Sequence, residues 1–300
     1  MTEPSGVILL NKPEGLTSHD CVNRMRRLFG TKKVGHTGTL DPMATGVLPI
    51  LIGRATKAAD LLVSDSKKYR AGLRLGITTD TEDTSGEVLT ESDRIPSSVD
   101  VYNACKKFAG DIMQVPPMYS ALKVDGQKLV DLARRGVSVE REARPVTIYS
   151  LEAEAGDSER DYILTVHCSK GTYIRTLCAD IGAELGCGGV MSSLTRLASG
   201  GFALEACTTL EALDKMTIEE RQALLLPIES LFSELPSVKL PPFFEKLSRD
   251  GNEIYQKKIG TAHAVGTRMR LYGAGGFYAL AEVREYEAGS AIKVIKLFSL

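Results

Sequence analysis

The chain has 300 residues, which is enough for about two domains of ordinary size. Its hydrophobic share of 43% and its formal net charge of −1 at pH 7 exclude a globally disordered chain and a protein that coats nucleic acid non-specifically. No apolar run approaches the roughly 20 residues of a membrane span, and the N-terminus lacks the apolar core of a secretory leader, so we expect a cytoplasmic protein with no membrane association.

The N-terminal segment is predicted to form a strand, a turn and a helix. Val7–Leu10 is a short apolar run typical of a buried strand, and Asn11–Gly15 has the composition of a turn. Ser18 is a typical helix N-cap, followed by apolar residues at helical spacing up to Phe29. Gly30 is expected to end this helix.

The middle of the chain is predicted to mix strands and helices. Residues 68–77 place apolar and polar side chains on opposite faces, which indicates a half-buried strand, and the polar residues 78–86 indicate a loop. Three further segments are predicted from their apolar spacing or their prolines: a helix over 99–108, an extended crossing over 114–120 and a short basic helix that ends at Gly136.

A second alternating strand is predicted over 162–168, and Thr172 is expected to cap the helix that follows it. Residues 210–226 are a further helical stretch. Strands and helices are interspersed here without a regular βαβ rhythm. The pattern therefore favours the α+β class over a doubly wound α/β fold.

The composition changes at 235–242, where three prolines mark a linker. Beyond it, residues 269–272, 277–283 and 291–298 read as short strands separated by Gly-rich turns, which predicts a small β-domain. We therefore expect a larger domain over 1–234 and a smaller one over 235–300.

The cysteines give no sign of a metal site. Six are spread along the chain without a Cys-x-x-Cys pair and without a histidine at zinc-ligand spacing. They are typical of reduced thiols, and although Cys168 could in principle act as a nucleophile, no motif couples it to a base. No phosphate-binding Gly-rich motif is present either, so we expect neither a metal nor a nucleotide cofactor.

Residues 35–49 are too rich in Gly, Thr and Pro to run through as one helix or one strand. This segment carries one carboxylate, Asp41, at an Asp-Pro turn. Taken alone, such an aspartate usually makes an Asx-turn or caps a helix. A catalytic carboxylate is the alternative, and the segment by itself leaves both open.

Four segments carry a more specific pattern. They are Leu10-Asn11-Lys12-Pro13-Glu14-Gly15, the segment 35–49, Lys68-Tyr69-Arg70 with Thr79-Asp80-Thr81-Glu82-Asp83, and His167-Cys168-Ser169-Lys170-Gly171-Thr172-Tyr173-Ile174-Arg175. In order and in spacing they resemble the TruB family of tRNA pseudouridine synthases, and the resemblance runs from Val7 to Leu197.

The resemblance implies a fold and an activity. The fold is of the pseudouridine-synthase type, a mixed and mainly antiparallel sheet flanked by helices. The activity is the cofactor-free isomerisation of uridine to pseudouridine at position 55 in the T-arm of tRNA. The segment from Leu240 is loosely similar to the PUA-type RNA-binding β-barrel that family members append, and a generic β-domain is the alternative.

The resemblance also implies three catalytic residues. Asp41 is the nucleophile, and Tyr69 stacks on the target uracil and is able to handle a proton. Arg175 pairs with Asp41. A cation in the first turn of a helix is opposed by the helix dipole, so an anionic partner would explain the position of Arg175 better than solvent does. From the sequence alone Tyr69 is as readily an ordinary core tyrosine, and Arg175 a solvent-facing arginine.

The remaining expected contacts are with the substrate base. A uridine inside a folded tRNA arm must be flipped out of its stack before an enzyme can reach its sugar. By resemblance His36 stacks in the space that the base leaves, and Tyr173 and Leu194 line the uracil pocket. Lys12 and Pro13 are expected to brace the loop that carries Asp41.

Two other functions stay open. One is an RNA-folding protein that remodels tRNA and in which catalysis is secondary. The other is the guide-RNA-dependent relative of archaea and eukaryotes, which works with partner proteins. The compact tail and the insertion at 78–86 favour a stand-alone enzyme that needs no guide RNA.

Overall fold

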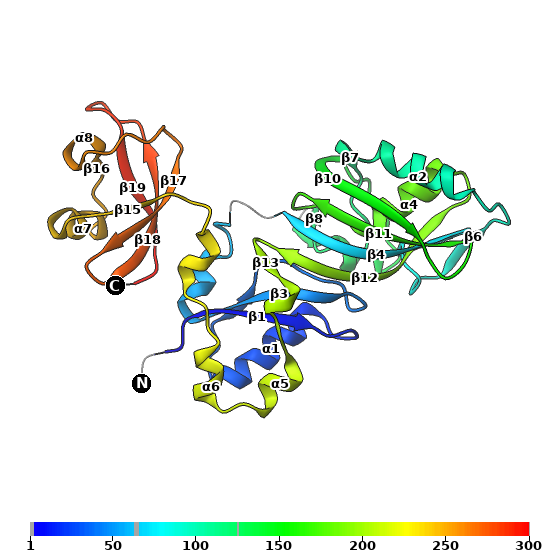
Figure 1. The fold of residues 1–300 in the computed structure, drawn as a ribbon, viewed down its shortest axis with the longest axis horizontal. Coiled ribbons are helices and arrows are strands. Elements are labelled where there is room, and N and C mark those ends of the chain that lie inside the picture. Colours follow the sequence, from blue (N-terminus) through cyan, green and yellow to red (C-terminus); the bar gives the residue numbers. More distant parts are fainter. Residues whose placement is uncertain (1–2, 63–65, 125, 300) are drawn as a thin grey trace.

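The computed structural model describes residues 3–62, 66–124 and 126–299. Most of them build a body around one sheet of ten strands, and the last part of the chain forms a separate small sheet (Figure 1). The main path of the large sheet is β14 (Thr208–Thr209), β1 (Gly6–Lys12), β3 (Thr45–Ile52), β12 (Gly189–Ser199), β4 (Lys67–Leu75), β11 (Asp161–Cys168), β10 (Arg144–Ala155) and β7 (Gly110–Gln114).

The sheet is mixed and mainly antiparallel, as predicted. Two short strands flank the path: β2 (Val34–His36) pairs with β3, and β13 (Phe202–Ala203) pairs with β12. The pairings of β1 with β14 and of β3 with β12 are parallel, and the other pairings on this path are antiparallel. Since β12 and β3 share only the register pairs Thr195↔Thr45 and Arg196↔Gly46, the two halves of the sheet meet at a short seam.

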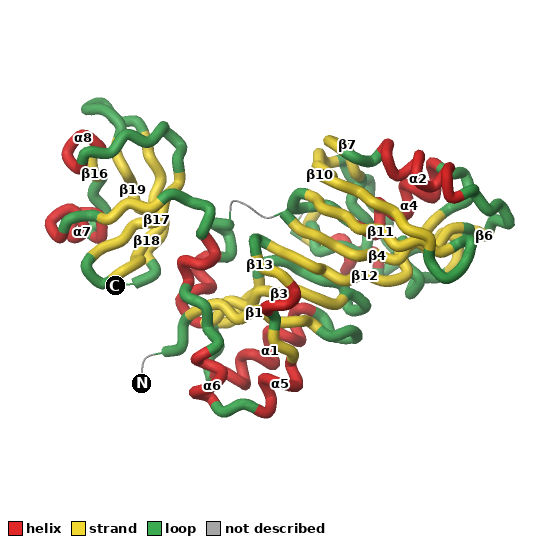
Figure 2. Tube along the Cα trace, in the orientation of Figure 1, coloured by secondary structure: helices red, strands yellow, loops and turns green. Residues whose placement is uncertain are grey.

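Helices cover one face of the larger half of the sheet (Figures 1 and 2). Strand β4 alternates as predicted, with Tyr69, Ala71, Leu73 and Leu75 buried and Arg70 and Arg74 exposed. Helices α2 (Ser98–Lys107) and α4 (Ile174–Glu184) add their apolar side chains to the same core cluster. The chain also forms two small hairpins and a short helix: β5 (Ile77–Thr79) with β6 (Val88–Glu91), β8 (Lys123–Val124) with β9 (Gln127–Lys128), and α3 (Leu129–Ala133).

Two predicted helix caps were wrong. Helix α1 (Ser18–Phe29) is capped by Thr17, whose side chain accepts from the Asp20 backbone while the Asp20 carboxylate accepts from the Thr17 backbone. Ser18 is buried and its hydroxyl binds both backbone groups of Leu40 instead. At α4 the N-cap is Tyr173 rather than Thr172.

The predicted helical stretch over 210–226 is divided. It forms α5 (Leu210–Lys215) and α6 (Ile218–Ala223), because Thr217 starts a new helix by exchanging capping hydrogen bonds with Glu220. Three short 3₁₀ helices complete the body: η1 (Gly53–Ala58), η2 (Leu204–Ala206) and η3 (Ile228–Phe232).

The small sheet has the order β15 (Ser237–Lys239), β17 (Arg268–Gly273), β18 (Gly276–Arg284), β19 (Ala291–Leu297) and β16 (Ile254–Tyr255). Its own apolar core lies under α7 (Pro242–Arg249) and next to α8 (Gln256–Ile259). Most of the predicted linker over 235–242 is regular structure, since residues 237–239 form β15 and Pro242 occupies the first helical position of α7, where a missing N–H costs nothing. Among the described residues no helix has the length and apolarity that a bilayer crossing requires.

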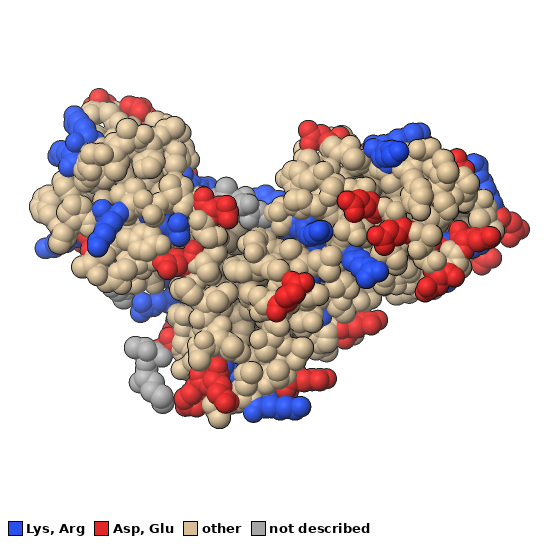
Figure 3. All heavy atoms as spheres, viewed as in Figure 1, with Lys and Arg blue, Asp and Glu red and all other residues tan. Residues whose placement is uncertain are grey.

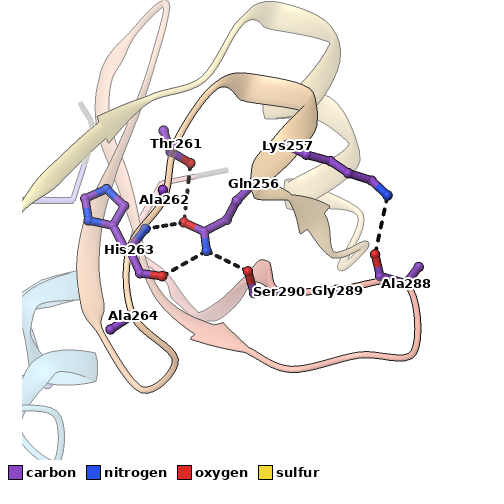
Figure 4. A pocket seen from close by; sticks show the side chains of 9 residues that line it. All are labelled: Gln256, Lys257, Thr261, Ala262, His263, Ala264, Ala288, Gly289 and Ser290. Carbon is purple, nitrogen blue, oxygen red and sulfur yellow. Dashed lines mark hydrogen bonds between the residues drawn. The ribbon is translucent and has the colours of Figure 1, made fainter.

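A shallow pocket in this small domain is organised by one side chain (Figure 4). Gln256 accepts from the backbone N–H of His263 at 2.7 Å and donates to its carbonyl at 3.0 Å and to the Ser290 hydroxyl at 2.9 Å. Because the Gln256 amide is satisfied on both sides, it acts as a brace between the loops at 261–264 and 288–290.

The seam between β3 and β12 depends on a glycine, which gives a stability prediction. Gly46 has a φ of +103°, and a Cβ there would overlap the backbone of Arg196. Gly30 also has a positive φ, +62°, but open space surrounds its Cβ position. We expect Gly30→Ala to cost about 1 kcal/mol of the free energy of unfolding and Gly46→Ala at least about 3 kcal/mol, because only the second adds a steric clash to the backbone strain. Urea unfolding of both variants tests this, and equal losses would contradict it.

Candidate active site

Asp41 lies in the loop between the paired strands β2 and β3. The Thr37 N–H donates to the Pro49 carbonyl at 3.2 Å, and the Ala44 N–H donates to the Asp41 carbonyl at 3.1 Å. The second contact closes a turn over Asp41-Pro42-Met43-Ala44. The loop is therefore a folded structure that presents the Asp41 side chain at a turn.

A buried lysine ammonium group binds the backbone of this turn. Lys12, at the end of β1, is fully buried, and its Nζ donates to the carbonyls of Ala44 at 2.6 Å, Pro13 at 2.8 Å and Pro42 at 3.2 Å. Burial lowers the pKa of Lys12. Since three carbonyl oxygens hold its three N–H groups, Lys12 ties the turn at Pro42 and Ala44 to Pro13 after β1, which fits the bracing role expected for it.

The structure brings Arg175 and Asp41 into contact. The Arg175 Nε lies 3.0 Å from Asp41 Oδ2, and its Nη2 lies 3.4 Å from Oδ1. The Arg175 side chain is only 6% exposed, whereas the Asp41 side chain is 34% exposed. The carboxylate thus faces an opening while its cation is held inside the protein.

The other contacts of Arg175 were not predicted. Its Nη1 donates to the Thr81 carbonyl at 3.1 Å and lies 3.8 Å from Asp83 Oδ2, and its Nη2 donates to the Tyr119 carbonyl at 2.7 Å. Asp83 is itself 5% exposed and accepts from Thr81 and Ser85. One guanidinium therefore joins two carboxylates and two loops.

This arrangement sets the charge of Asp41. The pKa of Asp41 lies above its usual value, because burial raises it most and the negative charge of Asp83 adds to this, while Arg175 lowers it. Arg175 is therefore the group that chiefly keeps Asp41 ionised in a partly buried place.

Tyr69, Leu194 and Tyr173 belong to three different elements near the Asp41 loop. Tyr69 on β4 is 6% exposed and pairs with Arg196, whose other strand partner is Gly46 of β3. Leu194 on β12 is 7% exposed, and its carbonyl accepts from the Thr45 hydroxyl at 3.5 Å. Tyr173 precedes α4, and burial raises the pKa of its phenol. Its backbone is fixed by the Gln114 amide, which donates to its carbonyl at 3.0 Å and accepts from its N–H at 2.8 Å.

His36 ends β2, at the start of the loop that carries Asp41. Its ring is half-buried, and its Nδ1 is buried without a hydrogen-bond partner among the described residues. Burial lowers the pKa of His36, and the charge of Arg196 lowers it further. His36 therefore favours the neutral imidazole at neutral pH.

Two other kinds of chemistry were considered from the sequence, a metal centre and a cysteine nucleophile. Within residues 3–62, 66–124 and 126–299, no group of three or more His, Cys, Asp and Glu side chains is arranged to hold a metal ion. Cys168 is buried, and burial raises the pKa of its thiol to about 11, which is the opposite of what a nucleophilic cysteine needs.

Comparison with known proteins gives consistent matches. Residues 26–174 match the family described as TruB family pseudouridylate synthase, N-terminal domain, and residues 175–233 match the tRNA pseudouridylate synthase B C-terminal domain. A relative named tRNA pseudouridine synthase B from Syntrophotalea carbinolica is 43% identical over 98% of each chain, and one of the same name from Alkaliphilus oremlandii is 44% identical over 98% of each.

Solved structures with a similar fold include complexes that contain the protein Cbf5. A Cbf5-Nop10-Gar1 complex matches with a TM-score of 0.73 and 26% identity over 98% of this chain and 85% of the other. The Nop10-Cbf5 complex of the archaeal box H/ACA sRNP matches with a TM-score of 0.70 and 25% identity over 99% of this chain and 87% of the other.

Proposed function

Since this chain belongs to the TruB family of pseudouridine synthases, we propose that it isomerises the uridine at position 55 in the T-arm of tRNA, with Asp41 as the nucleophile. The reaction class itself, the conversion of uridine to pseudouridine in tRNA, follows from the family and from relatives of that name over nearly the full length. The single observation that supports the residue assignment best is the ion pair between Asp41 and the buried Arg175.

The reaction requires no co-reactant. The C1′–N1 bond of uridine breaks, the base rotates, and C5 joins C1′; C5 loses a proton and N1 gains one, so substrate and product are isomers. A carboxylate near the sugar can act by attack at C1′ or by removing a sugar proton, and both routes need an ionised group. The contacts of Arg175 with Asp41 supply that condition.

The other residues are assigned to handling of the base. A flipped uracil needs a flat apolar surface and a pocket wall, which Tyr69, Tyr173 and Leu194 offer around Asp41. Tyr69 is also the candidate to handle the C5 proton. His36, neutral and at the edge of the loop, is assigned to stacking in the gap that the flipped base leaves.

The small domain over 235–300 is proposed to be a PUA-like RNA-binding domain, and the catalytic domain to span 1–234. The support is its separate five-stranded sheet and its own core. The face of the molecule in Figure 3 carries interspersed acidic and basic side chains. Lys257 and Lys258 in the last turn of α8 are the groups proposed to contact tRNA phosphates. A tRNA substrate places the enzyme in the cytoplasm.

The test uses tRNA transcript labelled with tritium at uridine C5 and the purified protein, without metal, guide RNA or partner. Formation of pseudouridine replaces the C5–H bond, so tritium release mapped to the T-arm uridine is the expected result. Release that depends on an added guide RNA would favour the guide-dependent alternative. Tight binding of tRNA without release would favour the RNA-folding alternative.

A further inference from the structure

Arg196 on β12 is held in an unusual environment. Its side chain is fully buried, at 0% exposure, and it is among the largest fully buried side chains of the described chain. No carboxylate lies within ion-pair distance of it among the described residues. Buried charges are usually paired or fully hydrogen-bonded, so the role of Arg196 follows from the groups that hold it.

The partners of Arg196 are three carbonyl oxygens, two in the loop that carries Asp41 and one in β3, which follows this loop. Its Nε donates to Val47 at 2.7 Å, its Nη2 to Gly38 at 3.1 Å and its Nη1 to Thr39 at 3.5 Å. Gly38 and Thr39 precede Asp41, and Val47 follows it. One planar guanidinium therefore ties the two arms of the loop together behind the catalytic turn.

The backbone position of Arg196 strengthens this link. Arg196 pairs with Gly46 of β3 on one side and with Tyr69 of β4 on the other. It also lies two residues after Leu194 on the same strand, and side chains two apart in a strand share a face. Arg196 thus lies at the seam of the sheet, between Tyr69, which is assigned to stacking on the uracil, and strand β3, which follows the Asp41 loop.

We propose that Arg196 is a positioning residue for catalysis, which sets the place of Asp41 by fastening both arms of its loop to the central strand. The inference rests on the proposed role of Asp41. Arg196 touches neither substrate nor reacting atoms, because it has no exposed surface. Its loss acts through the loop, so it changes the rate of the chemical step and leaves tRNA affinity nearly unchanged.

The test compares Arg196→Met and Arg196→Lys with Arg221→Met. Arg221 is a matched control, since its guanidinium also donates to three carbonyls, those of Leu213, Leu28 and Asp214, but it joins α6 to α5 and α1. We expect Arg196→Met to lower the single-turnover rate about 100-fold, because small displacements of a reacting group cost that much. Arg196→Lys regains part of this rate, since an ammonium can still hold some of the carbonyls.

The dissociation constant for tRNA should stay within about threefold in both Arg196 variants, since a factor of 3 is under 1 kcal/mol. Arg221→Met should lose thermal stability without loss of rate. The proposal is overturned if the rate loss in Arg196→Met is no larger than that in Arg221→Met. It is also overturned if Arg196→Met loses only tRNA affinity. If Arg196→Met does not fold, an unchanged rate in Arg196→Lys overturns the proposal. An active Asp41→Asn variant would instead show that the proposed role of Asp41 is wrong.

Discussion

The Asp41→Asn variant is expected to lose pseudouridine formation by more than about 10³-fold while it keeps its fold and its affinity for tRNA. Asparagine has nearly the same shape as aspartate but neither the charge nor the nucleophilic oxygen. Arg175 remains held by the carbonyls of Thr81 and Tyr119 and by Asp83, so the surrounding structure has no reason to collapse. Tritium release under single-turnover conditions measures the loss.

A matched control is Asp214→Asn, the same chemical change at a carboxylate that pairs with Arg24 on the surface. It should leave the turnover unchanged. Turnover in Asp41→Asn comparable to this control would remove Asp41 from the chemistry, and a complete loss of tRNA binding would show that Asp41 is not a purely chemical residue. If Asp41→Asn restores growth to a deletion strain, the benefit to the cell comes from RNA folding instead.

Replacing Arg175 by methionine is expected to lower the rate by about 100-fold or more and to change its pH dependence. Without Arg175, only burial and Asp83 still act strongly on Asp41, and both raise the pKa of Asp41. Asp41 then takes up its proton at a higher pH, so the acid limb of the pH–rate profile moves upward. The variant also leaves Asp83 buried without a cation, which should cost about 3 kcal/mol of the free energy of unfolding.

Asp83→Asn tests the same electrostatic balance in the opposite direction. The charge of Asp83 raises the pKa of Asp41, so removing that charge lowers it and the acid limb moves to lower pH. Single-turnover rates measured across the acid range for both variants give the two shifts. Shifts in the same direction would contradict the arrangement in which Arg175 and Asp83 act against each other on Asp41.

The sequence predicted those elements in which the local pattern of apolar, polar and glycine residues matches the burial and backbone conformation of the folded chain. The alternation of β4 and the glycine that ends α1 at a φ of +62° both appear as expected. The cap positions were less predictable, because Thr17 and Ser18 are adjacent and both suited to capping. The choice between them is made by Leu40, which lies far along the chain and binds the Ser18 hydroxyl.

Strand β12 and the role of Arg196 could not be predicted. Its polar residues and two irregularities, near Ser192 and near Leu197, break the alternation that would reveal a strand. An arginine in such a segment is normally solvent-facing, and only the folded loop supplies the carbonyls that hold Arg196 inside. The contact between Asp83 and Arg175 could not be predicted either, although Asp83 belongs to one of the motifs, because only the folded chain brings the two side chains together.

The small domain is joined to the body by a shared apolar cluster. Phe232 of η3 and Ala58 of η1 are buried together with Leu280 of β18 and Phe298 of the small domain. Lys57 also donates to the Leu297 carbonyl at 3.0 Å. The domain is therefore not a detachable module. Truncation at residue 234 would expose apolar surface and lower the solubility of the protein. The contribution of the small domain to tRNA affinity is therefore better measured with point substitutions at Lys257 and Lys258 in the intact chain.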